Sequence, residues 1–209
     1  MGRPARYDRD EVLQRAVTLF WEQGYHATSM KDLEAALDMR PGSLYAEFGS
    51  KAGVFGAALE AYAEASEQRL RDVLAGAPGV VAGIRAYLEA VAATCAGAEP
   101  AGARACMIVK TVLEVSGHEP GLAEQANRHL ERLEQVLAQA IADAQAAGEI
   151  DSAADPCRLA RLIQAQITGL RAYAQRSVSP AEVRALAADM AAILDGHLTG
   201  AVDSQLEAL

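Results

Sequence analysis

Apolar residues recur at helical spacing along most of the chain, and the breaks between these stretches predict about nine helices. The first three patterns are short and cover about residues 8–24, 28–38 and 40–48. A long pattern follows to about residue 75, and five more succeed it before the C-terminus. Strand-like alternation of useful length does not occur in the sequence. We therefore predict an all-α fold with an N-terminal three-helix head and a C-terminal helical bundle.

The region from Thr28 to Lys51 predicts two short helices joined by a tight turn, followed by the start of a third helix. Thr28 or Ser29 can cap the first of these helices. Asp38 stands at the turn and is one of the few non-glycine types that tolerates a left-handed backbone. Pro41 occupies a first-turn position of the next helix, where its missing N–H costs nothing. A short helix with a polar, hydroxyl-rich outer face suits the major groove of DNA.

The string GSLYAEFGSK, with TSMKDLEAAL before it, closely resembles the DNA-binding domain of the TetR family of transcriptional regulators. In that family a G-S-x-Y-x-x-F-x-x-K string marks the recognition helix and the first residue of the following long helix. The resemblance covers roughly residues 8–60. The family usually has glycine where Asp38 stands, and often an aromatic residue or histidine where Ala46 stands. The resemblance implies a helix-turn-helix DNA-binding domain over residues 1–52 and a ligand-binding and dimerisation domain over 53–209.

The resemblance also implies that one set of side chains contacts double-stranded operator DNA. These residues are Thr28, Ser29, Lys31, Arg40, Gly42, Ser43, Tyr45 and Lys51. Arg40 is the best candidate to read a guanine, because its planar guanidinium can donate to two acceptors on one base. Tyr45 and Lys51 are better suited to phosphates, which hold the protein in register without reading sequence.

Composition and charge agree with a globular helical protein. Of 209 residues, 51% are hydrophobic, and the formal net charge is −9. The N-terminal arm is nevertheless locally basic, with Arg3, Arg6 and Arg9 against only Asp8. Such an arm can hold phosphates, while an acidic body limits indiscriminate binding to DNA.

The sequence also suggests where the protein works. Its longest uncharged run covers 12 residues, from Val73 to Ile84, and falls short of the ~20 that a membrane span needs. The N-terminus is charged from Arg3 onward, which argues against a secretory signal. Three cysteines at unremarkable spacings favour a reducing compartment over a disulfide framework. We expect a cytoplasmic protein without a membrane partner.

Motifs for catalysis or for cofactors do not occur in the sequence. The four histidines are scattered, and there is no Cys-x-x-Cys, nucleophile elbow, phosphate-binding glycine loop or dinucleotide fingerprint. We therefore predict no catalytic residue, no metal and no cofactor. An all-helical enzyme or a protein-interaction module with a vestigial head stays open as the alternative from a different class.

A small-molecule effector is expected in the C-terminal body, where polar residues interrupt apolar helices. The candidates to line its cavity are Tyr62, Tyr87, Cys106, Lys110, Gln164 and Thr168. Buried polar groups such as Gln164 and Thr168 must find partners, either within the protein or on a ligand. Lys110 favours an anionic effector.

Cys106 supports a second version of this regulation. It lies one helical turn before Lys110, and a nearby ammonium makes the thiolate, the reactive form of cysteine, more abundant. The segment is similar to the corresponding helix of a TetR subgroup in which some members sense electrophiles or oxidants. Packing or pocket lining is the alternative role for this cysteine.

The last two helices carry the evidence for self-association. The stretch from about residue 156 to 176 is apolar on more than one side, which indicates either deep burial or an interface. The resemblance implies a homodimer through the final two helices. The candidate interface residues are Leu170, Tyr173, Val183, Leu186, Met190 and Ile193. The leading prediction is a homodimeric repressor on a palindromic operator, released by an effector.

Overall fold

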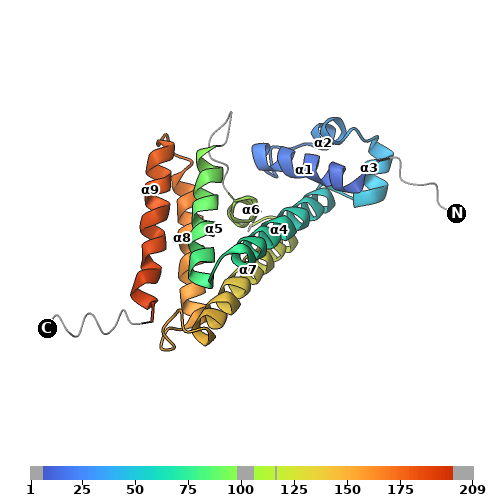
Figure 1. Ribbon diagram of the computed structural model, residues 1–209. Coiled ribbons are helices and arrows are strands. Elements are labelled where there is room, and N and C mark those ends of the chain that lie inside the picture. Colours follow the sequence, from blue (N-terminus) through green and yellow to red (C-terminus); the bar gives the residue numbers. More distant parts are fainter. Residues whose placement is uncertain (1–6, 98–105, 116, 200–209) are drawn as a thin grey trace. The chain divides into compact units, whose positions relative to one another are not determined.

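The computed structural model describes residues 7–97, 106–115 and 117–199, and every regular element in these ranges is a helix (Figure 1). The all-α prediction is confirmed. In order, the elements are α1 (Arg9–Gln23), α2 (Met30–Leu37), α3 (Pro41–Phe48), α4 (Lys51–Gly76), α5 (Val80–Ala96), α6 (Met107–Val115), α7 (Pro120–Ala146), α8 (Pro156–Tyr173), α9 (Pro180–Ala191) and the 3₁₀ helix η1 (Ala192–His197). None of the helices in these ranges is both long and apolar enough to cross a bilayer.

Local capping chemistry sets the ends of the first three helices. The Asp8 carboxylate accepts from the backbone N–H groups of Asp10 and Glu11 in the first turn of α1. Ser29 caps α2 and forms a reciprocal capping box with Asp32. Asp38 ends α2 with the left-handed backbone expected at the turn, at φ 51° and ψ 43°. Pro41 then begins α3 at its first position. The tight turn predicted between the two short helices is thus present.

The C-terminal helix differs from its predicted form. The apolar pattern predicts one helix to about residue 197, but α9 ends at Ala191 and the chain tightens into η1. The chain after η1 runs beside the segment between α7 and α8, where Asp151 N–H donates to the His197 carbonyl at 2.9 Å. Ile150 and Leu198 form an isolated antiparallel bridge there. The predicted start of the sixth helix, near residue 103, lies outside the described residues.

The chain divides into two compact units. One comprises Met1–Ser66 with Met107–His129, and the other comprises Glu67–Cys106 with Leu130–Leu209. Helices α4 and α7 therefore contribute residues to both units. The functional division expected after residue 52 stays a prediction.

An aromatic core holds the first unit together. Phe20 on α1 and Phe55 on α4 meet edge to face at 4.7 Å between ring centroids, and Tyr25 packs against Phe55 at 5.0 Å. Leu33 on α2 and Leu44 on α3 are almost fully buried. Helix α2 contacts α1. Burial of Leu33 and Leu44 fixes the inner faces of α2 and α3, so the opposite faces of the two short helices are left for solvent.

In the second unit α5, α8 and α9 lie side by side (Figure 1), and α5 contacts both α8 and α9. Their shared core includes Leu170 and Val183, which are 0% and 2% exposed within a single chain. Two of the residues expected at a dimer interface are therefore used for packing within one chain. The other four, which are half-buried, are Tyr173, Leu186, Met190 and Ile193.

Candidate nucleic-acid interface

Helix α3 presents a polar face that its own packing leaves open. Leu44 is buried and Phe48 is half-buried, and they hold the inner side of the helix. Gly42 and Ser43 are exposed, and Tyr45 keeps 51% of its surface in contact with solvent. The outer side therefore carries a hydroxymethyl, a phenol and a backbone with little side chain over it.

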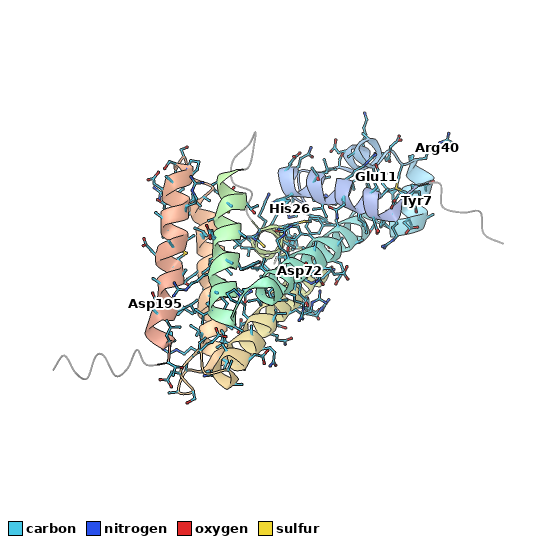
Figure 2. All side chains as sticks on the ribbon, in the orientation of Figure 1. Tyr7, Glu11, His26, Arg40, Asp72 and Asp195 are labelled. Carbon is cyan, nitrogen blue, oxygen red and sulfur yellow. The ribbon has the colours of Figure 1, made fainter. Side chains whose placement is uncertain are left out.

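Arg40 stands at the start of this face. It is the N-cap of α3, and its carbonyl accepts from Ser43 N–H at 2.9 Å and Leu44 N–H at 3.0 Å. The side chain takes no part in the cap and is exposed (Figure 2). The backbone of Arg40 is thus held in place while its guanidinium stays available to a base edge. Ser29 and Lys31, at the start of α2, are exposed as well.

Thr28 has a different environment from the other predicted DNA contacts. Its side chain is 1% exposed, and its hydroxyl donates to the Gly24 carbonyl at 2.7 Å. Burial and this bond make Thr28 part of the connection between α1 and α2. It is therefore left out of the interface proposed below.

Lys51 is also occupied within the head. Its ammonium donates to the carbonyls of Tyr25 and Thr28, both at 3.0 Å, and lies 4.4 Å from the centre of the Tyr25 ring. A cation at a helix start is unfavourable unless negative charge faces it, and the two carbonyl oxygens meet that need. Lys51 thereby fastens the connector of residues 24–28 to the start of α4.

We expect Lys51→Met to destabilise the protein by about 1–3 kcal/mol, because two carbonyls lose their donor while the apolar stem is kept. Denaturant unfolding measures this loss. The salt dependence of operator binding should be unchanged in Lys51→Met. If the slope of log K against log salt fell by about one while stability stayed unchanged, Lys51 would instead contact a DNA phosphate.

The connector of residues 24–28 is also bonded to α6 and to the turn before α7. The Glu114 carboxylate accepts from His26 N–H at 2.8 Å, and Tyr25 donates its hydroxyl to Glu119 at 2.7 Å. Burial, followed by this hydrogen bond, raises the pKa of Tyr25 to about 12. The phenol therefore stays a donor at any physiological pH. Sequence reasoning missed both glutamates, since their partners lie 88 and 94 residues away.

The predicted effector-lining residues are divided between the two units. Tyr62 and Lys110 belong to the first, where both contact Trp21. The Lys110 ammonium donates to the Trp21 carbonyl at 2.7 Å, and the Tyr62 ring meets the indole at 5.2 Å. The ammonium expected to attract an effector or to activate Cys106 therefore has a partner in the head.

In the second unit, α8 carries polar groups with unmet hydrogen-bonding capacity. The Gln164 amide donates to the Leu130 carbonyl at 3.0 Å, but its Oε1 is buried without a hydrogen-bond partner among the described residues. Thr168, one turn further along, is half-buried. Tyr87 is only 6% exposed. Burial raises the pKa of its hydroxyl, and the nearby positive charge of Arg171 partly offsets this rise. Arg171 was not among the predicted residues.

Metal ligation finds no support in the described ranges, where no three His, Cys, Asp or Glu side chains are gathered closely enough to hold an ion. Cys106, which precedes α6, is half-buried, Cys95 is buried, and Cys157 is exposed. All three are free thiols.

Two short helices with a tight turn, the second presenting an open polar face, define a helix-turn-helix DNA-binding protein. Residues 12–58 match the family model described as bacterial regulatory proteins, tetR family. Residues 80–190 match the model described as tetracyclin repressor-like, C-terminal domain. The chain belongs to the TetR family of DNA-binding transcriptional regulators. Regulators of this family are not enzymes, which confirms the prediction from the sequence that the protein has no catalytic function.

Similar proteins and solved structures support the assignment to the TetR family. The chain is 31% identical to the HTH-type transcriptional repressor ComR of Escherichia coli K12 over 180 residues, 85% of this chain and 84% of ComR. It is 32% identical to the uncharacterized HTH-type transcriptional regulator YezE of Bacillus subtilis 168, over 72% of this chain and 77% of YezE. A cysteine mutant of the TetR family regulator CifR, complexed with 26 bp operator DNA, superposes with TM-score 0.81 at 29% identity. That match covers 91% of this chain and 98% of CifR.

Proposed function

We propose that the protein is a repressor that binds a palindromic operator as a homodimer in the cytoplasm and is released by a small-molecule effector. The observation that carries the proposal is the open polar face of α3, introduced by an Arg40 side chain that plays no part in capping. The similarity to a relative named as a repressor and to a structure complexed with operator DNA supports it.

Six residues form the proposed DNA contact. They are Ser29, Lys31, Arg40, Gly42, Ser43 and Tyr45, all of them exposed. Arg40 reads a guanine, while Lys31 and Tyr45 hold phosphates and set the register of α3 in the groove. Packing within the chain does not require glycine at position 42, since a Cβ built there would meet no described atom within 4 Å. We propose that Gly42 serves a close approach of the α3 backbone to the DNA.

The proposed homodimer uses the outer faces of α8 and α9. Beyond the exposed Leu162, the exposed positions of α8 are all small: Ala165, Gly169 and Ala172 recur at spacings of four and three residues. Small side chains allow two helices to pack closely. Two heads on one side of DNA must reach successive major grooves, so half-site centres should lie about 34–36 Å apart or at a multiple of that.

The effector acts by binding one conformation of the protein better than the other, which shifts the population away from the state that fits the operator. Tyr87, Gln164 and Thr168, all in the second unit, remain the proposed contacts. The buried Oε1 of Gln164 suits a hydrogen-bond donor on the ligand. Arg171, whose charge acts on Tyr87, favours a ligand with an anionic group.

A thiol-sensing repressor is the second candidate. Cys106 is half-buried rather than enclosed, and it directly precedes α6, where a helix N-terminus stabilises a thiolate. Lys110 donates to Trp21, so the helix end rather than that ammonium would have to activate the sulfur.

The two candidates separate in one experiment. The protein is first tested for retention of a DNA fragment taken from around its own gene, since regulators of this kind usually lie beside their targets. Release from that fragment by an electrophile such as N-ethylmaleimide is then measured for wild type and Cys106→Ser, with Cys157→Ser as the exposed-thiol control. Release that is lost only in Cys106→Ser supports the thiol mechanism. Equal release in all three proteins removes it and leaves the reversible ligand.

A further inference from the structure

The outer face of α8 carries a large apolar side chain and, at its two ends, charges of opposite sign. Asp155 caps the start of α8 and Arg176 follows its end, with Leu162 and Gly169 between them, and all four are exposed. We propose that this face packs against the same face of a second copy, antiparallel, so that Leu162 lies over Gly169 of the partner subunit. The same alignment brings Asp155 to Arg176 of the partner subunit. The inference rests on the homodimer proposed above, and it adds the register and the charges by which the chain selects its own copy.

Exposed residues recur along α8 at alternating spacings of four and three residues. They are Arg158, Leu162, Ala165, Gly169 and Ala172. Positions with an average spacing of about 3.5 residues keep facing a partner helix along its whole length. Packing within the chain leaves Leu162 40% exposed, and a Cβ built at Gly169 meets no described atom within 4 Å. A large apolar side chain and a position with room for one therefore lie on the same side of α8.

Twofold symmetry turns one contact on this face into a complete alignment. In a symmetric dimer, if a residue contacts a second residue of the partner subunit, the second contacts the first in return. Asp155 lies seven residues before Leu162, and Arg176 lies seven residues after Gly169. In an antiparallel pair, Leu162 opposite Gly169 therefore sets Asp155 opposite Arg176. One register thus satisfies the apolar packing and pairs opposite charges at both ends of the helix pair.

A shift of this register by three residues removes the agreement. With Ala165 opposite Gly169 instead, Arg158 would face Arg176 of the partner subunit. Like charges set against each other across an interface cost free energy and suppress the wrong alignment. The charged residues at the ends of α8 therefore favour the register in which Leu162 meets Gly169.

The end of α8 that would receive Arg176 of the partner subunit is hollowed and acidic. A hollow of about 410 Å³ there is lined by Asp151, Asp155 and Leu162, among others. Each of the two carboxylates accepts a backbone N–H two residues further along at 2.9 Å, which holds it in place and leaves acceptor capacity free. The guanidinium carbon of Arg176 lies 5.0 Å from the centre of the Tyr173 ring. Stacking on that ring limits the freedom that the arginine loses on binding.

The test exchanges the large and the small residue between two variants. Leu162→Ala removes the large side chain from both contacts of its homodimer, and Gly169→Leu sets two leucines against each other at both. Each variant alone should therefore need a concentration at least about tenfold higher than wild type to dimerise. In the mixed dimer every leucine faces a glycine or an alanine, so native mass spectrometry should find far more mixed dimers than random pairing gives. Circular dichroism verifies the fold of each variant, and Leu113→Ala, which shortens a 78% exposed leucine on α6, should dimerise like wild type.

The charge contact is tested with Asp155→Asn, which keeps a good helix cap while it removes the charge, and with Arg176→Gln. Each should weaken the dimer about 2–5-fold at low salt and less at high salt, because the pairs lie at the exposed rim. The double variant should lose little more than either single variant, since both remove the same pairs. Arg161→Gln is the matched control, because Arg161 is exposed on α8 but pairs with Glu134 of its own chain at 3.2 Å.

The outcomes separate the register from the dimer itself. A dimeric wild type whose two packing variants pair at random overturns the register and leaves the proposed homodimer standing. Equal dimerisation of wild type, Asp155→Asn and Arg176→Gln at low salt overturns the charge contact. A wild type that stays monomeric in sedimentation at micromolar concentration overturns the homodimer and this inference together.

Discussion

Replacing Gly169 with glutamate should convert the protein to monomers and abolish tight operator binding. Gly169 lies in the interior of α8 and is exposed, and no described atom lies within 4 Å of a Cβ built there. Glycine inside a helix costs roughly 0.5–1 kcal/mol relative to alanine, and nothing in the described protomer requires it. A partner helix approaching closely at this position would require it, and a charged side chain would then block the approach.

Gly169→Ala separates this explanation from a simple loss of folding. Because alanine has a higher helix propensity than glycine, Gly169→Ala should raise the thermal midpoint of the single chain. Its effect on dimerisation shows whether the partner helix approaches too closely to leave room for a methyl group. Sedimentation at micromolar concentration measures the association of each variant, and circular dichroism verifies its fold. A Gly169→Glu protein that remains dimeric with full operator affinity would contradict the proposed interface. Leu170→Asp is a poor probe here, because Leu170 is buried in the core of its own chain.

Arg40→Ala should weaken binding to the cognate operator by about 1–3 kcal/mol, or roughly 5–150-fold, and relax the preference at one base pair. The expectation follows from the exposed guanidinium of Arg40, which the helix cap leaves unused. Stability should change little, because the capping bonds come from the backbone of Arg40.

Lys31→Ala is the comparison for Arg40. It removes an exposed charge at the start of α2 and should weaken binding by a similar factor on every sequence, with a shallower salt slope. Affinities for operators substituted one base pair at a time measure both effects. If Arg40→Ala lowers affinity uniformly, or not at all, the assignment of Arg40 to a base is wrong.

Much of the head follows from interactions within a few residues. Ser29 with Asp32 closes the start of α2, Asp38 adopts the left-handed turn, and Pro41 begins α3. Each of these depends on backbone geometry and on a partner no more than four residues away. The helical period of the apolar residues likewise predicted the all-α fold, because burial of one face is a property of the local pattern.

The site residues also divide into those set by local interactions and those set by contacts between distant parts of the chain. The sequence alone was enough to nominate Arg40, Ser43 and Tyr45, since their exposure depends on which side of α3 carries Leu44. It could not show that Lys51 bonds to two carbonyls of the connector or that Glu47 bonds to the start of the chain. Those partners lie 23–40 residues apart, and only the folded chain brings them together.

What the sequence by itself determined is the class of fold, the helix-turn-helix and its polar outer face, all of which rest on local periodicity and capping. The tertiary structure decided which apolar residues each core uses. It buries Leu170 and Val183 within one chain and leaves Gly169 and Ala172 outside. An apolar side chain gains similar free energy from burial against its own chain or against a partner. A pattern of hydrophobicity therefore cannot distinguish the two, and only the packing of α5, α8 and α9 does so.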